Sequence, residues 1–162
     1  VLDSDLTERV EGEQTAWLGQ ALAKRTGKVP FIFPCYHKAA YGTAKPPKDT
    51  NDSSKDPLAQ KIIKNWCPLF DKYRVTAVFE NDHHTYKRTH PLRANKVDKK
   101  NGVLYFGDGC WGVDTRSVPK PGELWYLAKA VSRRHLICVT LNNGQASYAA
   151  HEADGKVIDQ HP

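Results

Sequence analysis

Histidines and carboxylates occur in two short segments of the sequence, each just after a predicted buried strand. His37 follows the apolar run 29–34, and Asp82, His83 and His84 follow the run 74–79. Imidazole nitrogen is a common ligand of transition metals, and a nearby carboxylate can share the same site. If the two strands are parallel, both groups lie at one edge of a sheet, where open α/β sheets bind their ligands. The pattern therefore predicts a metal site that draws on these four side chains.

The order of residues in the second segment leaves the choice of ligands open. An extended backbone would direct Asp82 and His84 to one side and His83 to the other. Asp108 is a competing carboxylate, but it lies between glycines and is expected to cap a turn. A solvated polar loop is the alternative for the two histidines, and their alignment with His37 favours metal binding. The remaining histidines are expected on the surface or in packing: His90, His135, His151 and His161.

The segments between these groups predict a helical crossover that makes the two strands parallel. A helix over 12–25 has Trp17, Leu18 and Leu22 on one apolar face. Asp56-Pro57 is typical of a helix start, since a carboxylate caps the first turn and proline is tolerated in it. This second helix, 57–67, connects the strands. An exposed loop at 42–56 precedes it, and a third strand is expected at 103–106.

The last forty residues indicate an antiparallel meander. Strands are expected at 136–141, 146–151 and 157–158, because Asn142-Asn143-Gly144 and Asp154-Gly155 favour tight hairpin turns. The sequence thus predicts an α/β (α+β) fold in which a parallel β-α-β segment precedes a C-terminal meander.

Composition limits the classes of partner. The chain has 162 residues, enough for one domain, and a formal net charge of +6, which suits an anionic partner such as a phosphate ester. Its basic residues are spread along the sequence, so a solvated basic surface is the alternative. No apolar run approaches the ~18 residues of a membrane helix. We expect neither a membrane nor a nucleic acid as partner.

Cysteines and one sequon bear on the compartment. The four cysteines form no CxxC pair, which excludes zinc-ribbon and thioredoxin motifs and leaves one or two disulfides open. They are Cys35, Cys67, Cys110 and Cys138. Asn51-Asp52-Ser53 is a glycosylation sequon, consistent with a secreted or extracellular glycoprotein.

Three features in order along the chain resemble the second half of the calcineurin-like metallophosphoesterases, close to the purple acid phosphatases. Leu2-Asp3-Ser4 followed by the helix Gly12 to Leu18 is similar to a strand and a "GEQxxWL" helix. Tyr36-His37 with Tyr41 is similar to "HxPxY". The run from His84 to Arg88, followed by 102–109, is similar to "HxHxYxR" and its glycine-bearing strand.

The resemblance implies a partial calcineurin-like β-sandwich in which residues 1–162 form a single domain, the C-terminal half of a larger one. It implies two metal ions (Fe, Zn or Mn) that activate a water to hydrolyse phosphate monoesters, with His37 and His84 as ligands. Asp82 stands where the family has its first HxH histidine, so either Asp82 or His83 would serve. The first-half motifs are missing from the chain. We therefore expect a missing N-terminal half or a companion chain as partner, and weak or absent metal binding in this chain alone.

Two other functions stay open from the sequence. The first is a catalytically reduced binding or structural protein on the same scaffold, and the second is an unrelated anion-binding module. No Ser or Cys lies in a nucleophile motif, so no catalytic residue is assigned. An oligomer is also open.

Overall fold

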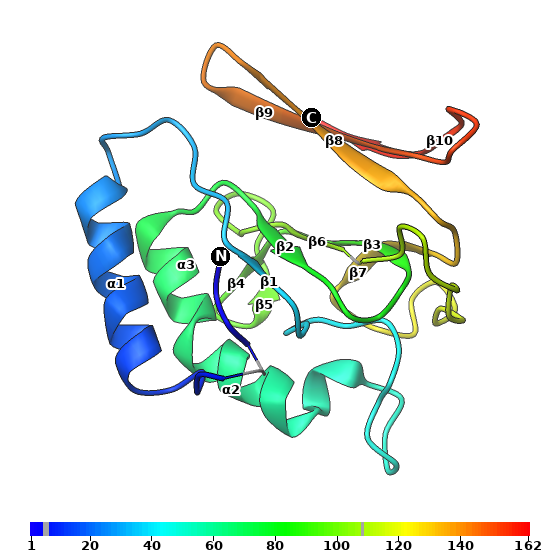
Figure 1. The fold of residues 1–162 in the computed structure, drawn as a ribbon, viewed down its shortest axis with the longest axis horizontal. Helices are drawn as coiled ribbons and strands as arrows, with labels where there is room; N and C mark the ends of the chain where they lie inside the picture. Colours follow the sequence, from blue (N-terminus) through cyan, green and yellow to red (C-terminus); the bar gives the residue numbers. More distant parts are fainter. Residues whose placement is uncertain (5–6, 108) are drawn as a thin grey trace.

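The computed structural model of the chain describes residues 1–4, 7–107 and 109–162. Three helices pack on one face of a five-stranded mixed sheet, and a three-stranded antiparallel sheet lies over the other face (Figure 1). The helices are α1 (Glu13–Arg25), α2 (Pro57–Asn65) and α3 (Cys67–Tyr73), with a 3-10 turn η1 (Ser53–Lys55) before α2.

The main sheet has the strand order β1-β2-β6-β3-β7. Its strands are β1 (Cys35–Tyr36), β2 (Val78–Glu80), β3 (Tyr86–Thr89), β6 (Tyr105–Gly107) and β7 (Leu127–Val131). A short hairpin, β4 (Leu92–Arg93) with β5 (Lys96–Val97), follows β3. The C-terminal sheet contains β8 (Leu136–Asn142), β9 (Gln145–His151) and β10 (Val157–His161).

The predicted parallel relation is confirmed, but the first strand lies at Cys35–Tyr36, after the predicted range 29–34, and the second begins later than predicted, at Val78. β1 is parallel to β2, and β2 is parallel to β6. The expected strand 29–34 contributes only isolated bonds, such as Thr76 N donating to the Ile32 carbonyl at 2.8 Å. Pro30 and Pro34 lack an N–H, so a regular ladder cannot form along this run.

The helices begin where the sequence places them. The carboxylate of Asp56 accepts bonds from the backbone N–H groups of Leu58 and Ala59 and so caps α2. The predicted helix 57–67 ends earlier, at Asn65, and α3 begins at Cys67. Pro68 lies in the first turn of α3, where its missing N–H is tolerated. In α1 the predicted apolar face is confirmed, since Trp17, Leu18 and Leu22 line one cavity. Leu18 and Leu22 are buried, whereas Trp17 is 55% exposed.

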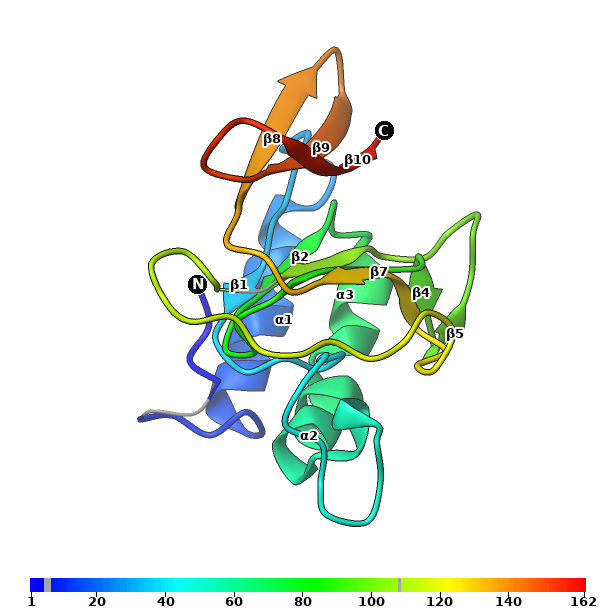
Figure 2. The same cartoon turned by 90° about the vertical axis from the view of Figure 1, so that its right-hand side faces the viewer.

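Alternation along the strands forms two apolar clusters, one on each face of the main sheet. Val78 and Tyr105 join the cluster under the helices. Phe79 and Phe106 point the other way and pack against the C-terminal sheet, where the ring of Tyr148 lies 4.4 Å from that of Phe106. Figure 2 shows this second sheet standing over the main one.

The C-terminal meander is confirmed. β8 pairs with β9 through a tight turn in which Asn143 and Gly144 have φ angles of 47° and 78°. β10 pairs with the other edge of β9. Asp159 on β10 reaches the main sheet, where its carboxylate accepts bonds from the Tyr86 hydroxyl and the Arg88 guanidinium, both at 2.7 Å.

Two further findings concern the whole described chain. No helix in residues 1–4, 7–107 and 109–162 is long and apolar enough to cross a membrane. The four cysteines form no disulfide within this part of the chain.

Candidate functional site

A charged corner lies where the carboxyl ends of β1 and β2 meet. The pairing continues past both strands, because the Asn81 N–H donates to the His37 carbonyl at 2.9 Å. This contact brings the next residue, Asp82, beside His37, whose Nε2 atom lies 3.4 Å from Asp82 Oδ1. The structure therefore places together two of the residues that the sequence singled out.

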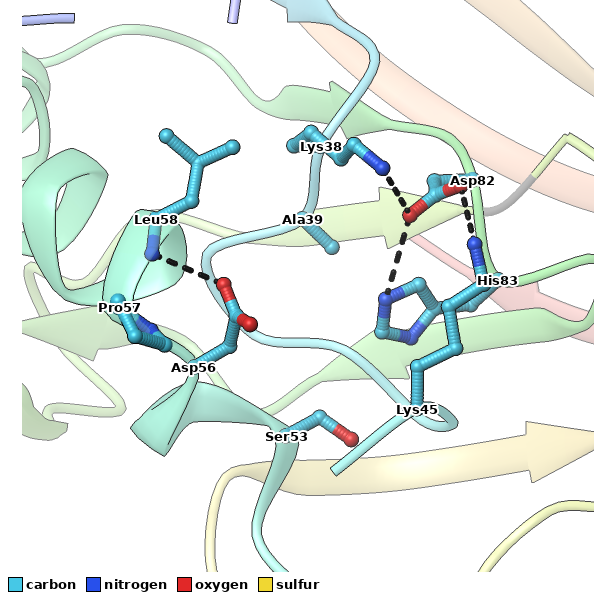
Figure 3. Close-up of a pocket in the computed structure, with 9 residues that line it drawn as sticks. All are labelled: Lys38, Ala39, Lys45, Ser53, Asp56, Pro57, Leu58, Asp82 and His83. Atoms are coloured by element: carbon cyan, nitrogen blue, oxygen red, sulfur yellow. Dashed lines mark hydrogen bonds and ion pairs between the residues drawn. The ribbon is translucent and has the colours of Figure 1, made fainter. Parts of the chain in front are cut away.

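Two lysines, which the sequence interpretation did not assign to the site, surround the same carboxylate (Figure 3). Lys45 Nζ lies 2.6 Å from Asp82 Oδ1, and Lys38 Nζ lies 3.2 Å from Oδ2. Burial alone would raise the pKa of Asp82, but the hydrogen bonds from Lys45 and Lys38 outweigh it and lower that pKa. Asp82 is therefore a buried anion held by two ammonium groups. We call His37, Lys38, Lys45 and Asp82 the charged corner.

His83 is buried beside this corner and has a structural task. Its Nδ1 atom accepts the backbone N–H groups of Thr43 and Ala44, both at 2.9 Å, so the ring proton belongs on Nε2. Nε2 lies 3.8 Å from Asp82 Oδ2. Burial lowers the pKa of His83 to about 3, and the charge of Lys87 acts in the same direction. The neutral ring thus holds the loop that carries Lys45.

The loop from Asp82 to His84 is not extended, so the expected alternation of side chains is wrong. Asp82 and His84 have φ angles of 105° and 55°. As a result Asp82 and His83 face the same corner, while His84 Nδ1 lies 3.2 Å from the Asp114 carbonyl on another segment. Asp108 lies outside the described residues, so its expected role as a turn cap is not described.

A cavity of about 330 Å³ opens beside the charged corner. It lies between the end of β2 and the start of α2, as the close-up in Figure 3 shows. Its lining residues are Lys38, Ala39, Lys45, Ser53, Asp56, Pro57, Leu58, Asp82 and His83. The predicted loop 42–56 is exposed only in part, because Thr43, Ser53 and Ser54 are buried.

No protein-family model matches the chain. Two uncharacterised proteins of Mycobacterium tuberculosis, from strains CDC 1551 and H37Rv, are each 33% identical to it over 108 residues. The match covers 65% of this chain and 16% of each relative. Purple acid phosphatase PPD1 from yellow lupin seeds superposes with a TM-score of 0.82 at 20% identity, covering 98% of this chain and 29% of the lupin protein.

The chain has the fold of part of a purple acid phosphatase. GAP50, the anchor in the inner membrane complex of Plasmodium, also superposes, with a TM-score of 0.69 at 14% identity over 92% of this chain and 41% of that protein. The fold class predicted from the sequence motifs is confirmed, with two sheets that do not close on each other. The chain spans about a sixth of the mycobacterial relatives and under a third of the lupin protein.

The purple acid phosphatase fold implies metal ions, so we tested whether the side chains fit them. The described residues contain no group of three or more His, Cys, Asp or Glu side chains that could hold a metal ion. His37 and Asp82 supply two donors at one point, whereas a closed site usually needs four. Lysine amines contact both oxygens of Asp82. This part of the chain does not fit a metal centre by itself, and the ligand roles of His37, Asp82, His83 and His84 stay predictions.

A buried ion pair lies beneath the charged corner. Glu80 and Lys87 are both 0% exposed, and the Lys87 amine contacts Glu80 Oε2. Glu80 Oε1 also accepts the Tyr36 hydroxyl and the Ala40 N–H, both at 2.7 Å. The pair thus fixes the segment that carries His37. The sequence did not predict this contact, because two charged residues seven positions apart give no local signal of pairing.

The other predicted sites are placed as follows. Asn51 is exposed, and its amide lies 3.4 Å from Glu123 Oε1. Glycosylation there stays a prediction. His135 is buried, stacks edge-on against Tyr86 and lies 3.2 Å from Cys110 Sγ, which fits the expected packing role.

Proposed function

We propose that this chain is part of a phosphoesterase-type protein and that its charged corner binds the phosphate group of a phosphate ester. One observation carries the proposal: two ammonium groups and one imidazole converge on a single buried carboxylate at the ends of two parallel strands. This edge is where open α/β sheets bind ligands.

The charges at the corner favour an anion. Lys38 and Lys45 carry two positive charges against the one negative charge of Asp82. Asp56 also lines the cavity, but its carboxylate caps the first turn of α2. Both lysines remain partly exposed, at 28% and 40%, so an entering phosphate can share their donors.

Backbone strain supports a binding role. Asp82 and Lys45, which form the 2.6 Å ion pair, have φ angles of 105° and 56°. Non-glycine residues in such conformations cost about 1–3 kcal/mol each and cluster at functional sites. The fold thus holds this ion pair in place against a local cost.

In this proposal a longer protein, which adds a second segment, hydrolyses phosphate monoesters with two ions of Fe, Zn or Mn. The described residues offer too few ligands for the reaction, so we expect the isolated chain to bind phosphate and not to hydrolyse esters. The alternative is a catalytically reduced binding protein, and the two lysines on Asp82 favour it.

An apolar groove is the proposed contact for the second segment. A cavity of about 250 Å³ lies between residues 1–2, helix α1 and residues 32–34, with the half-exposed Trp17 at its side. We expect the isolated chain to self-associate or to bind a hydrophobic dye. A monomeric chain that leaves the dye unbound would count against a missing segment.

We also propose that the protein is secreted. The exposed Asn51 is accessible to a glycan, and mass spectrometry of the native protein would detect one.

Phosphate binding can be tested by calorimetric titration of the chain with inorganic phosphate. Lys38→Gln with Lys45→Gln removes two charge-assisted donors, so affinity should fall at least about tenfold. Lys64→Gln is the matched control, since Lys64 is an exposed lysine of α2, and should bind phosphate as the original chain does. Equal affinity in the double variant would exclude the corner as the phosphate site.

In the same samples, p-nitrophenyl phosphate should stay intact. Turnover by the isolated chain with added metal, lost on His37→Ala, would overturn the assignment of hydrolysis to a longer protein.

A further inference from the structure

Arg116 contacts the backbone of Asp82, the residue whose side chain the two lysines contact. Its Nη1 atom donates to the Asp82 carbonyl at 2.7 Å, and its backbone N–H donates to the His84 carbonyl at 3.2 Å. These two bonds hold the arginine against the loop that follows β2. A third cationic side chain therefore lies beside the charged corner, from a segment more than 30 positions further along the chain.

The guanidinium of Arg116 differs from three other arginines in having no acidic partner. Arg88, Arg133 and Arg134 each pair with a carboxylate, at 2.7, 3.3 and 2.9 Å. Arg116 forms no ion pair within the described part of the chain, and only its Nη1 atom donates from the side chain there. The residue is also partly buried. A guanidinium with unused N–H groups in such a place suits an anionic ligand.

A second cavity, of about 500 Å³, opens beside Arg116. Lys45 lines both this cavity and the first one, so the two adjoin at that lysine. Val118 and Pro119 add apolar surface to the second cavity. A ligand held by Lys45 can therefore extend into a space that has carbon surface and a further cation.

The charges of the second cavity indicate which anion it suits. Lys45 and Arg116 are positive, and Glu123 is negative. The Glu123 carboxylate accepts the Lys120 N–H at 3.0 Å and the Asn51 amide at 3.4 Å, so it has neutral donors of its own. Two positive charges and one negative charge favour a singly charged carboxylate over a doubly charged phosphate. The planar fork of a guanidinium also matches the two oxygens of a carboxylate.

Asp82 limits the distance between the two cationic groups. Lys45 Nζ lies 2.6 Å from Oδ1 of this residue, and Arg116 Nη1 lies 2.7 Å from its main-chain oxygen. Two such oxygens of one aspartate are at most about 5 Å apart, so the amine and the guanidinium lie within roughly 10 Å of each other. A ligand of a few carbon atoms with an anion at each end can span this distance.

We propose that Arg116 binds a carboxylate on the organic part of the ligand, and that the site therefore accepts phosphate esters of small hydroxy carboxylic acids. The phosphate lies on Lys38 and Lys45, the carboxylate lies on Arg116, and the carbon atoms between them contact Val118 and Pro119. This inference rests on the proposed function, because it takes the phosphate to bind at the charged corner.

The test is calorimetric titration of the full chain with two probes that differ by one carboxylate, ethyl phosphate and 2-phosphoglycolate. The original chain should bind 2-phosphoglycolate at least about tenfold more tightly, since a bidentate carboxylate contact adds two charge-assisted bonds. Arg116→Gln should reduce this ratio of affinities to below about threefold. Arg25→Gln is the matched control and should keep the ratio, because Arg25 is exposed and its Nη1 also donates only to a backbone carbonyl, that of Ala21.

Arg116→Lys keeps the charge without the fork, so its ratio should fall between those of the original chain and Arg116→Gln. Circular dichroism checks that each variant is folded, and Arg116→Lys replaces Arg116→Gln if the latter is not. Equal affinity for the two probes in the original chain overturns the inference, as does a ratio that the folded Arg116 variant leaves unchanged. Failure of the phosphate proposal gives a different result, in which ethyl phosphate does not bind, or binds equally well to Lys38→Gln with Lys45→Gln.

Discussion

The buried Glu80–Lys87 pair allows a quantitative test of how the charged corner is supported. Lys87→Met keeps an unbranched side chain of similar length and removes the charge. Glu80 then remains 0% exposed as an anion whose other partners are the neutral donors of Tyr36, Ala40 and Tyr41. The segment that leads to the corner loses its charged anchor.

The expected cost follows from this burial. Removing one partner of a buried ion pair destabilises a protein by about 3–5 kcal/mol, which is a large share of the ~5–15 kcal/mol that stabilises a typical domain. Glu80→Gln with Lys87→Met removes both charges and leaves no unpaired ion. The double variant should therefore lose at least about 2 kcal/mol less than the sum of the single variants.

The assay is urea unfolding at pH 7, followed by tryptophan fluorescence, since Trp66 is 0% exposed. Lys64→Met is the control and should stay within about 0.5 kcal/mol of the original chain, as surface changes usually do. A loss below about 1 kcal/mol for Lys87→Met, or strict additivity in the double variant, would refute the assignment of a buried, paired charge.

Three further changes test other contacts by urea unfolding. Asp159→Asn should destabilise by about 1–3 kcal/mol at pH 7. Burial acts to raise the pKa of Asp159, but the hydrogen bonds from Arg88 and Tyr86 outweigh it and lower that pKa. The difference in unfolding free energy between the original chain and Asp159→Asn should therefore shrink as the pH falls below about 4. A difference that stays constant with pH would contradict this pairing. Burial lowers the pKa of His83 from 6.5 to about 3. The free energy of unfolding of the original chain should therefore fall relative to that of His83→Asn by up to ~1.4 kcal/mol for each pH unit below 6.5. Parallel pH profiles of the two proteins would contradict this assignment of a buried neutral histidine. Gly42→Ala places a Cβ 2.0 Å from the buried His83 ring and should cost at least ~1–3 kcal/mol; an unchanged midpoint would contradict this contact.

Local signals in the sequence were sufficient for several elements of the fold. Asp56-Pro57 predicts the start of α2 because capping depends on adjacent residues, and the structure has that cap. Asn143-Gly144 likewise predicts the hairpin of β8 and β9, since both residues adopt positive φ. The parallel relation of β1 and β2 followed from the intervening helix.

Elements that depend on distant contacts were missed. The sequence predicts a polar loop where the structure has β3, because the central residues Lys87 and Arg88 are charged. Each is paired in the fold, Lys87 with Glu80 and Arg88 with Asp159 of β10, 71 positions away. A charged residue can lie in a buried strand only when such a partner exists, and the sequence around β3 does not reveal the partner.

In the candidate site, too, local features were predictable and features that depend on distant contacts were not. The positions of His37 and Asp82 at the ends of two strands predicted that they meet, since that depends only on parallel pairing. The orientation of His84 was wrong, because the φ angles of 105° and 55° at Asp82 and His84 break the expected alternation. Lys45 was missed because the loop that carries it is held by His83.

The charged corner meets a requirement that a buried carboxylate imposes. Asp82 must be paired, because an isolated buried charge is costly. Two lysines meet that requirement from the two oxygens, Lys45 at Oδ1 and Lys38 at Oδ2. The loop that carries Lys45 is held in turn by His83, whose Nδ1 atom accepts the N–H groups of Thr43 and Ala44. The pairing of Asp82 therefore depends on a buried neutral ring as well as on the two ammonium groups.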